Sequence, residues 1–119
     1  MYMVWPAVSR RSDIYGVSDS YATAAENIDG YLFPVGEAWR IIWNGSSDID
    51  LYAGDGFHPS VAGTYLAAAV MYEQIAGRSP ARLPARATRT GLNSAELDAL
   101  NAAAVAANDA HSRLPNSND

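Results

Sequence analysis

Hydrophobic and polar positions divide this chain into segments with helical and extended patterns. The residues from Val61 to Ala76 are apolar almost all round, which predicts a helix buried on more than one side. Pro59 and Ser60 mark its start, because proline suits a first helical position and serine suits an N-cap. Gly77 follows the last apolar residue, so we expect the helix to end there.

Other segments show helical patterns that are shorter or less apolar. A helix is expected over residues 19–29, where apolar side chains recur at i, i+3, i+4 and i+7, and a short one over residues 36–43. A last helix is expected after Asn93, because Glu96 three residues later gives a capping-box pattern. Its apolar stripe consists of Leu97, Leu100, Ala104, Ala107 and His111. Residues 9–18 are expected to form a loop, and residues 79–91 an extended surface segment.

Two short runs, Tyr2 to Trp5 and Tyr31 to Val35, are apolar and rich in β-prone residues. With a helix between them they resemble a strand–helix–strand unit, whose strands would be parallel. The pattern therefore predicts an α/β fold with two parallel strands and about four helices. We expect one domain over residues 1–92, a C-terminal helix over residues 93–112, and a disordered tail over residues 113–119.

Composition narrows the classes of function. The chain has 119 residues, 49% of them hydrophobic and 18% charged, which suits one folded domain. A net charge of −5 argues against nucleic acid as a partner, because binding phosphates needs a concentrated basic face. There is no cysteine, which excludes disulfides and leaves the redox compartment undetermined. The longest apolar run, Tyr65 to Tyr72, is too short to span a bilayer, and the first residues lack signal-peptide features; we expect a soluble protein of undetermined location.

Candidate chemistry gathers in the segment Asp55-Gly56-Phe57-His58, directly before the most apolar helix. A histidine that acts as a general base needs a partner on one ring nitrogen, which fixes its tautomer and orientation. An acid three residues before the histidine can be that partner, and Gly56 allows the tight turn that brings them together. Asp55 and His58 are therefore the candidate catalytic residues.

The sequence DGFHPS, followed by VAGTYLAAAVMYEQIAG, resembles the last catalytic block of the SGNH hydrolases, the GDSL-type serine esterases. The segment PVGEAW, residues 34–39, is similar to the strand end that precedes this block in bacterial members. The resemblance covers roughly residues 1–80 and implies the C-terminal part of a three-layer α/β/α domain. It also implies hydrolysis of an acyl or acetyl ester, possibly linked to a carbohydrate, by a Ser-His-Asp triad.

The chain lacks the block that carries the nucleophilic serine in that family and the blocks that donate to the oxyanion. Ser46, Ser47 and Ser60 are the serines near the site, and turn or cap roles explain them better. We therefore expect Asp55 and His58 to act with a nucleophile on sequence not present here, and the chain alone to be inactive.

Alternatives to this interpretation are a metal site, a structural role for the aromatic residues, and a protein without activity. Asp48 and Asp50 precede Asp55 and His58, but the set lacks the ligand types and spacing of zinc or calcium sites, so we expect no metal and no cofactor. Phe57 and Trp39 are candidate substrate-binding residues, although core packing is the simpler role for Trp39.

The competing functional class is a fragment or interaction module that folds by self-association. A sheet of two strands is marginal. The chain is therefore expected to form a homo-oligomer or to pair with a missing N-terminal half.

Overall fold

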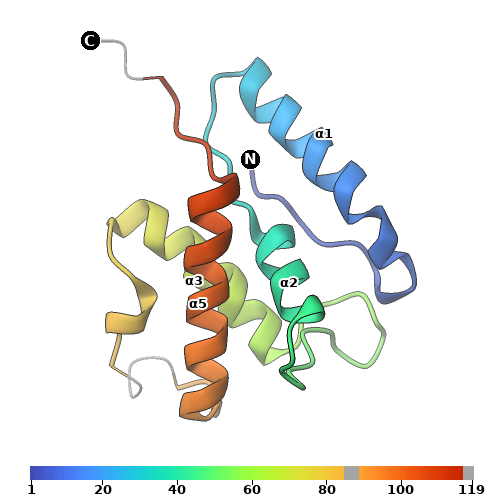
Figure 1. Ribbon diagram of the computed structural model, residues 1–119, viewed down its shortest axis with the longest axis vertical. Helices are drawn as coiled ribbons and strands as arrows, with labels where there is room; N and C mark the ends of the chain where they lie inside the picture. Colours follow the sequence, from blue (N-terminus) through green and yellow to red (C-terminus); the bar gives the residue numbers. More distant parts are fainter. Residues whose placement is uncertain (85–88, 117–119) are drawn as a thin grey trace.

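The computed structural model describes residues 1–84 and 89–116, which form helices joined by loops (Figure 1). Within these residues the α-helices are α1 (Ile14–Asn27), α2 (Val35–Asn44), α3 (Val61–Ala76) and α5 (Ser94–His111). The 3-10 helix η1 (Val8–Asp13) precedes α1, and the 3-10 helix η2 (Pro80–Arg82) follows α3. The middle of the expected surface segment and the last residues of the expected tail, 85–88 and 117–119, lie outside the described residues.

The predicted α/β fold is wrong, because residues 1–84 and 89–116 contain no β-strand. The two β-prone runs meet only at an isolated parallel bridge between Tyr2 and Phe33. There the Met3 amide donates to the Phe33 carbonyl at 3.1 Å, and the Phe33 amide donates to the Met1 carbonyl at 2.9 Å. A ladder needs several successive pairs, but α2 already begins at Val35 and ends the extended stretch. The three-layer arrangement that the family resemblance implied is therefore not the architecture of this chain.

The core lies where α2, α3 and α5 pack against one another (Figure 1). Its largest completely covered side chains include Trp39 of α2, Leu66 of α3 and Leu100 of α5. The α5 residues that face this core are mostly alanines, which favour the helix and leave room for neighbouring backbones to come close. The stripe predicted for this helix is confirmed from Leu97 to Ala107, and His111 at its end is half-buried.

Helix α3 begins and ends, and helix α5 begins, where the sequence predicts. The Ser60 hydroxyl accepts a hydrogen bond from the Gly63 amide at 3.1 Å, and α3 ends at Gly77 with a left-handed φ of 61°. Asn93 and Glu96 form a complete capping box at the start of α5. These boundaries rest on contacts within a few residues of sequence, which explains why local patterns reveal them.

The N-terminal part differs from the prediction. Residues 9–18 are not a loop, because η1 and the first turn of α1 occupy them. Ile14 is 3% exposed and anchors the start of α1, and Arg10 pairs with Asp13 at 2.6 Å within η1. Buried contacts from distant parts of the chain thus outweigh the loop-like composition of this segment.

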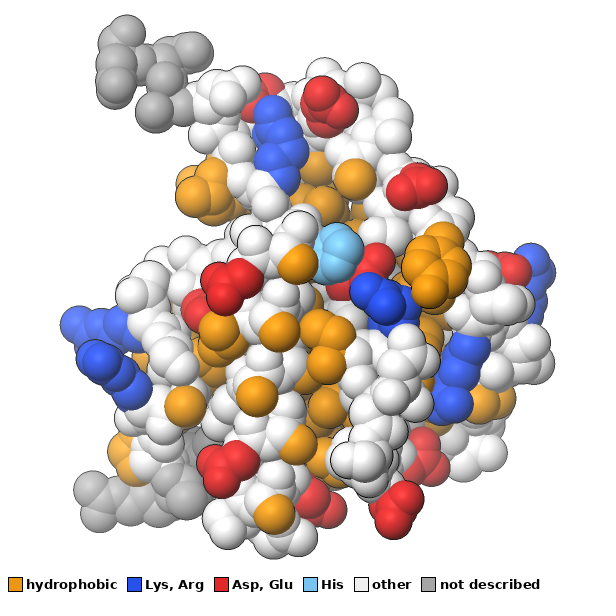
Figure 2. Space-filling view, viewed as in Figure 1, with side chains coloured by type: hydrophobic (Ala, Val, Ile, Leu, Met, Phe, Trp, Pro, Cys, Tyr) orange, Lys and Arg blue, Asp and Glu red, His pale blue; other side chains and the backbone are white. Residues whose placement is uncertain are grey.

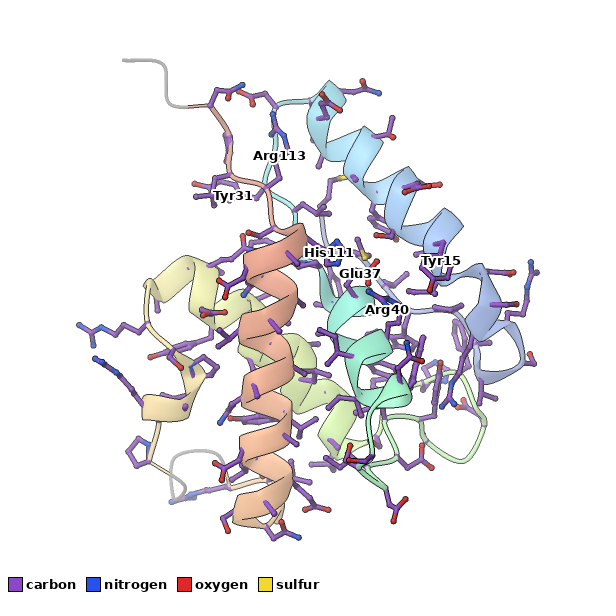
Figure 3. The ribbon with its side chains drawn as sticks, in the orientation of Figure 1. Tyr15, Tyr31, Glu37, Arg40, His111 and Arg113 are labelled. Carbon is purple, nitrogen blue, oxygen red and sulfur yellow. The ribbon has the colours of Figure 1, made fainter. Side chains whose placement is uncertain are left out.

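The C-terminal end of the described chain returns to the bridge region. The Leu32 amide donates to the Arg113 carbonyl at 2.9 Å, and the Arg113 side chain pairs with Asp29 at 2.6 Å. Figure 3 shows Arg113 beside the segment that carries Tyr31. Within residues 1–84 and 89–116, no helix has the length and apolar character needed to cross a membrane.

Candidate acid–base site

The structure brings the two candidate catalytic residues together. Nδ1 of His58 lies 2.5 Å from Oδ2 of Asp55, which is a short hydrogen bond. Both side chains face solvent, with 70% of the His58 side chain and 50% of the Asp55 side chain exposed. The carboxylate therefore fixes Nδ1, and no hydrogen bond of the described residues engages Nε2. This leaves Nε2 as the ring nitrogen that can exchange protons with an outside group.

The turn that joins these residues is held by the other oxygen of the same carboxylate. Oδ1 of Asp55 accepts hydrogen bonds from the amides of Phe57, at 3.0 Å, and His58, at 2.9 Å. Gly56 lies between them with a left-handed φ of 68°, a conformation that other residues adopt at a cost. The glycine therefore has the role that the sequence predicts for it. It allows a turn in which the Asp55 carboxylate contacts both the backbone amides of the turn and the imidazole.

A short antiparallel contact closes the base of this loop. Tyr52 and Pro59 form an isolated bridge, where the Ala53 amide donates to the His58 carbonyl at 2.8 Å. One residue further out, the Ser60 amide donates to the Leu51 carbonyl at 2.9 Å. The acid–base turn is thus tied to the first residue before α3 and, through buried Leu51, to the core.

Hydrogen bonding sets the ionisation of the acid. The bond from His58 lowers the pKa of Asp55 most, and the amides of Phe57 and His58 lower it further, to about 2 from 3.8. Asp55 is therefore ionised at neutral pH and can stabilise a positive charge on the imidazole. An ionised acid beside a histidine is the arrangement that general-base catalysis by histidine requires.

The two aromatic candidates for substrate binding lie in different surroundings. Phe57 is 56% exposed, and its ring packs edge-on against the His58 ring at 5.1 Å between centroids. Trp39 has no exposed surface: it stacks on Trp5 at 3.8 Å and meets the edge of Tyr52 at 5.0 Å. Phe57 can therefore touch a molecule bound at the imidazole, whereas Trp39 packs the core and offers no surface to a substrate.

None of the three nearby serines forms a hydrogen bond to His58 within the described part of the chain. The Ser60 hydroxyl donates to the Asp50 carbonyl at 2.7 Å and accepts the capping bond from the Gly63 amide, so its proton and one of its two lone pairs are already used. Ser46 is exposed and Ser47 half-buried in the loop after α2. The geometry thus supplies an acid and a base, and it leaves the attacking hydroxyl unassigned.

The acidic loop before the site does not collect into an ion-binding cluster. Asp50 is used locally, because its Oδ1 accepts a hydrogen bond from the Tyr52 amide at 3.0 Å. Among the described residues, no three or more His, Asp or Glu side chains lie close enough together to hold a metal ion.

A second group of charged residues was not predicted as a group from the sequence. On the face of the molecule shown in Figure 2, a histidine lies among acidic and basic side chains, and Figure 3 identifies the set as Glu37, Arg40 and His111 beside Tyr15. Glu37 is only 2% exposed; its carboxylate pairs with Arg40 at 2.5 Å and lies 3.7 Å from Nε2 of His111. Glu37 and Arg40 are three residues apart on α2, but nothing local in the sequence connects them to His111 at the end of α5.

The charge of Glu37 is stabilised despite its burial. Burial raises the pKa of Glu37, but hydrogen bonds from Arg40 and Ser18 and the charges of His111 and Arg40 together bring it below 4.5. The carboxylate thus joins α1, α2 and α5 at one point. Protein groups already supply the hydrogen bonds and charges that the Glu37 carboxylate needs. We therefore interpret this cluster as a structural connection between helices rather than a second acid–base site.

Comparison with known proteins adds no relative: no family model, no curated protein and no solved structure matches the chain.

Proposed function

We propose that Asp55 and His58 form the acid–base pair of an ester-hydrolysing site, with His58 as the general base and Asp55 as its orienting acid. The observation that carries the proposal is the 2.5 Å contact between Nδ1 and Oδ2 on a surface where 70% of the imidazole side chain is exposed. The resemblance of DGFHPS to the acid–histidine block of serine esterases supports the choice of an ester as substrate.

The proposed step follows from which ring nitrogen is free. Because the Asp55 carboxylate accepts the proton on Nδ1, the lone pair of the neutral ring is on Nε2. A hydroxyl group or a water molecule attacks the ester carbonyl, and Nε2 takes the proton of this attacking group. Asp55 stabilises the resulting imidazolium. The same proton then passes to the leaving alcohol. Proton transfer of this kind contributes about 10²–10⁴-fold to a rate.

The reaction needs an attacking group that neither Asp55 nor His58 supplies. The hydroxyl of Ser60 is committed to capping α3, so it is a poor nucleophile. In place of the inactive chain expected from the sequence, we propose that the chain alone activates a water molecule at a low rate, and that full activity needs a hydroxyl from another polypeptide segment. A small, accessible ester is the substrate class that an open site of this kind can accept.

The experiment compares hydrolysis of p-nitrophenyl acetate by the wild type, His58→Ala, Asp55→Asn and His111→Ala. Any exposed imidazole hydrolyses this ester slowly, so the chain's other histidine, His111, supplies the matched control. Asp55→Asn is informative because the amide of asparagine donates to Nδ1, which moves the ring proton to Nε2 and removes the base.

We expect the wild type to hydrolyse the ester faster than free imidazole does. His58→Ala and Asp55→Asn are expected to lose this additional rate, and His111→Ala is expected to keep it. Equal rates for all four proteins would leave the pair without catalytic function. A loss in His58→Ala with full activity in Asp55→Asn would show that the histidine reacts without its acid, which contradicts the proposed mechanism.

Self-association is the second candidate function, and the N-terminal segment favours it. Tyr2 and Val4 are 40% and 38% exposed, and this extended segment forms a single isolated bridge within the described residues. An apolar extended edge of this kind can pair with another chain. Sedimentation equilibrium tests this directly: a concentration-independent monomer would exclude self-association as the function.

A further inference from the structure

Two consecutive peptide groups hold the Asp55 carboxylate from one side. The amide of Phe57 shares a planar peptide group with the carbonyl of Gly56, and the amide of His58 shares one with the carbonyl of Phe57. Both amides point at Oδ1 of Asp55, at 3.0 and 2.9 Å. The direction of these two planes therefore decides where the carboxylate sits, and with it the position of Oδ2 against the imidazole.

The carbonyls of the same two peptide groups are held from the opposite side by the N-terminal segment. The Val8 amide donates to the Gly56 carbonyl at 2.9 Å, and the indole N–H of Trp5 donates to the Phe57 carbonyl at 3.0 Å. Each plane is thus fixed at both ends. Because a peptide group is rigid, losing the bond to its carbonyl frees the amide at its other end to rotate away from Asp55.

The donors themselves have little freedom to move. The Trp5 ring stacks on the buried Trp39 at 3.8 Å between centroids, with the two planes 5° apart. A Cβ atom on Gly56 would meet Cγ1 of Val8 at 2.7 Å, so this side chain already lies against the glycine backbone. The turn is therefore clamped between its own carboxylate and a segment anchored in the core.

We propose that Trp5 and Val8 are positioning residues of the acid–base pair, acting through the two peptide groups that orient the Asp55 carboxylate. The functional importance of this clamp rests on the proposed role of His58 as a general base. The clamp itself can be measured without any turnover, in the resting protein.

The test uses two variants that remove one donor each. Trp5→Phe keeps an aromatic ring to stack on Trp39 but has no N–H. Val8→Pro removes the backbone N–H, and proline is compatible there, because Val8 is the first residue of η1 and Ala7 before it is extended, with ψ at 156°. The pKa of Asp55 is followed by NMR titration of its carboxyl carbon, and the state of His58 by the ¹⁵N signals of its ring.

Two control variants separate positioning from general destabilisation. Val8→Ala trims the same side chain and keeps the N–H. Tyr52→Phe removes the hydroxyl bond to the Pro6 carbonyl, 2.7 Å long, which joins the same two segments away from the two peptide groups. All variants are compared by thermal unfolding and titrated well below their melting temperatures.

In Trp5→Phe and Val8→Pro we expect the pKa of Asp55 to rise from about 2 toward 3.8, and the Nδ1 signal of His58 to move toward that of a free imidazole. Val8→Ala and Tyr52→Phe are expected to titrate like the wild type. Wild-type titration in both donor variants would overturn the proposal, and so would equal shifts in donor variants and controls. Shifted titrations together with equal ester hydrolysis by the wild type and His58→Ala would support the clamp and refute only the proposed activity.

Discussion

Substitution of Gly63 by alanine tests how closely α3 packs against the elements that carry the site. A Cβ at this position would lie 2.3 Å from the Leu51 carbonyl oxygen and 2.6 Å from Cζ2 of Trp39. Neither neighbour can move away easily. The Leu51 carbonyl accepts a hydrogen bond from the Ser60 amide at 2.9 Å, and Trp39 has no exposed surface.

The expected size follows from two opposing contributions. Overpacking against rigid neighbours costs about 3 kcal/mol, and the higher helix propensity of alanine returns up to about 1 kcal/mol. The expected net loss is about 2 kcal/mol. Dividing it by the unfolding entropy, about 2.1 cal/mol/K per residue, gives the change in melting temperature. For 119 residues the melting temperature then falls by about 8 °C.

Gly16 of α1 supplies the matched control, because a Cβ there meets no atom within 4 Å. Gly16→Ala is expected to raise the melting temperature by up to about 4 °C, through helix propensity alone. Circular dichroism at 222 nm, measured while heating wild type and both variants, gives the comparison. A Gly63→Ala protein that melts at or above the wild-type temperature would show that α3 does not approach Leu51 and Trp39 this closely.

Three further predictions follow from single residues. Asn93→Ala removes half of the capping box of α5 and is expected to cost about 1 kcal/mol in urea unfolding; an unchanged midpoint would mean that the cap is not formed in solution. Glu37→Ala removes the charged hydrogen bond to the partly exposed Arg40, and we expect a loss of about 2 kcal/mol at neutral pH, measured by urea unfolding. The folded pKa of Glu37 lies below 4.5, so the stability that this carboxylate contributes is present above pH 4.5 and is lost as the pH falls further. We therefore expect the stability of the wild type to fall more steeply with decreasing pH than that of Glu37→Ala. In His58→Ala the pKa of Asp55 should rise from about 2, since the largest cause of its lowering is gone; a carboxyl titration that stays at the wild-type value would contradict the pairing.

The parts of the fold that sequence reasoning predicted correctly depend on neighbouring residues. The ends of α3 follow from Ser60 and Gly77, and the start of α5 follows from Asn93, because each cap is made within a few positions of the chain. The predicted strands failed for the opposite reason. A β-prone run becomes a strand only if enough partner backbone lies beside it, and that supply is a property of the whole fold. Here α2 begins at Val35 and leaves a single bridge.

The candidate site divides in the same way. The spacing of Asp55 and His58 is local, so the contact between them could be predicted from a turn with a glycine inside it. The indole of Trp5 reaches the turn across 52 residues of sequence, and no local pattern indicates this contact. Glu37 and His111 likewise meet only because α2 and α5 pack together.

The parallel stack of Trp5 on Trp39 gives the molecule an optical signal of its own. Two indole rings 3.8 Å apart interact electronically, and this coupling ends when the rings separate. The near-ultraviolet circular dichroism band should therefore report whether the first residues of the chain are seated on the core. Local detachment of these residues, with the helices intact, would weaken this band before the far-ultraviolet signal changes, while the contacts of Trp39 with Trp43 and Tyr52 keep part of it.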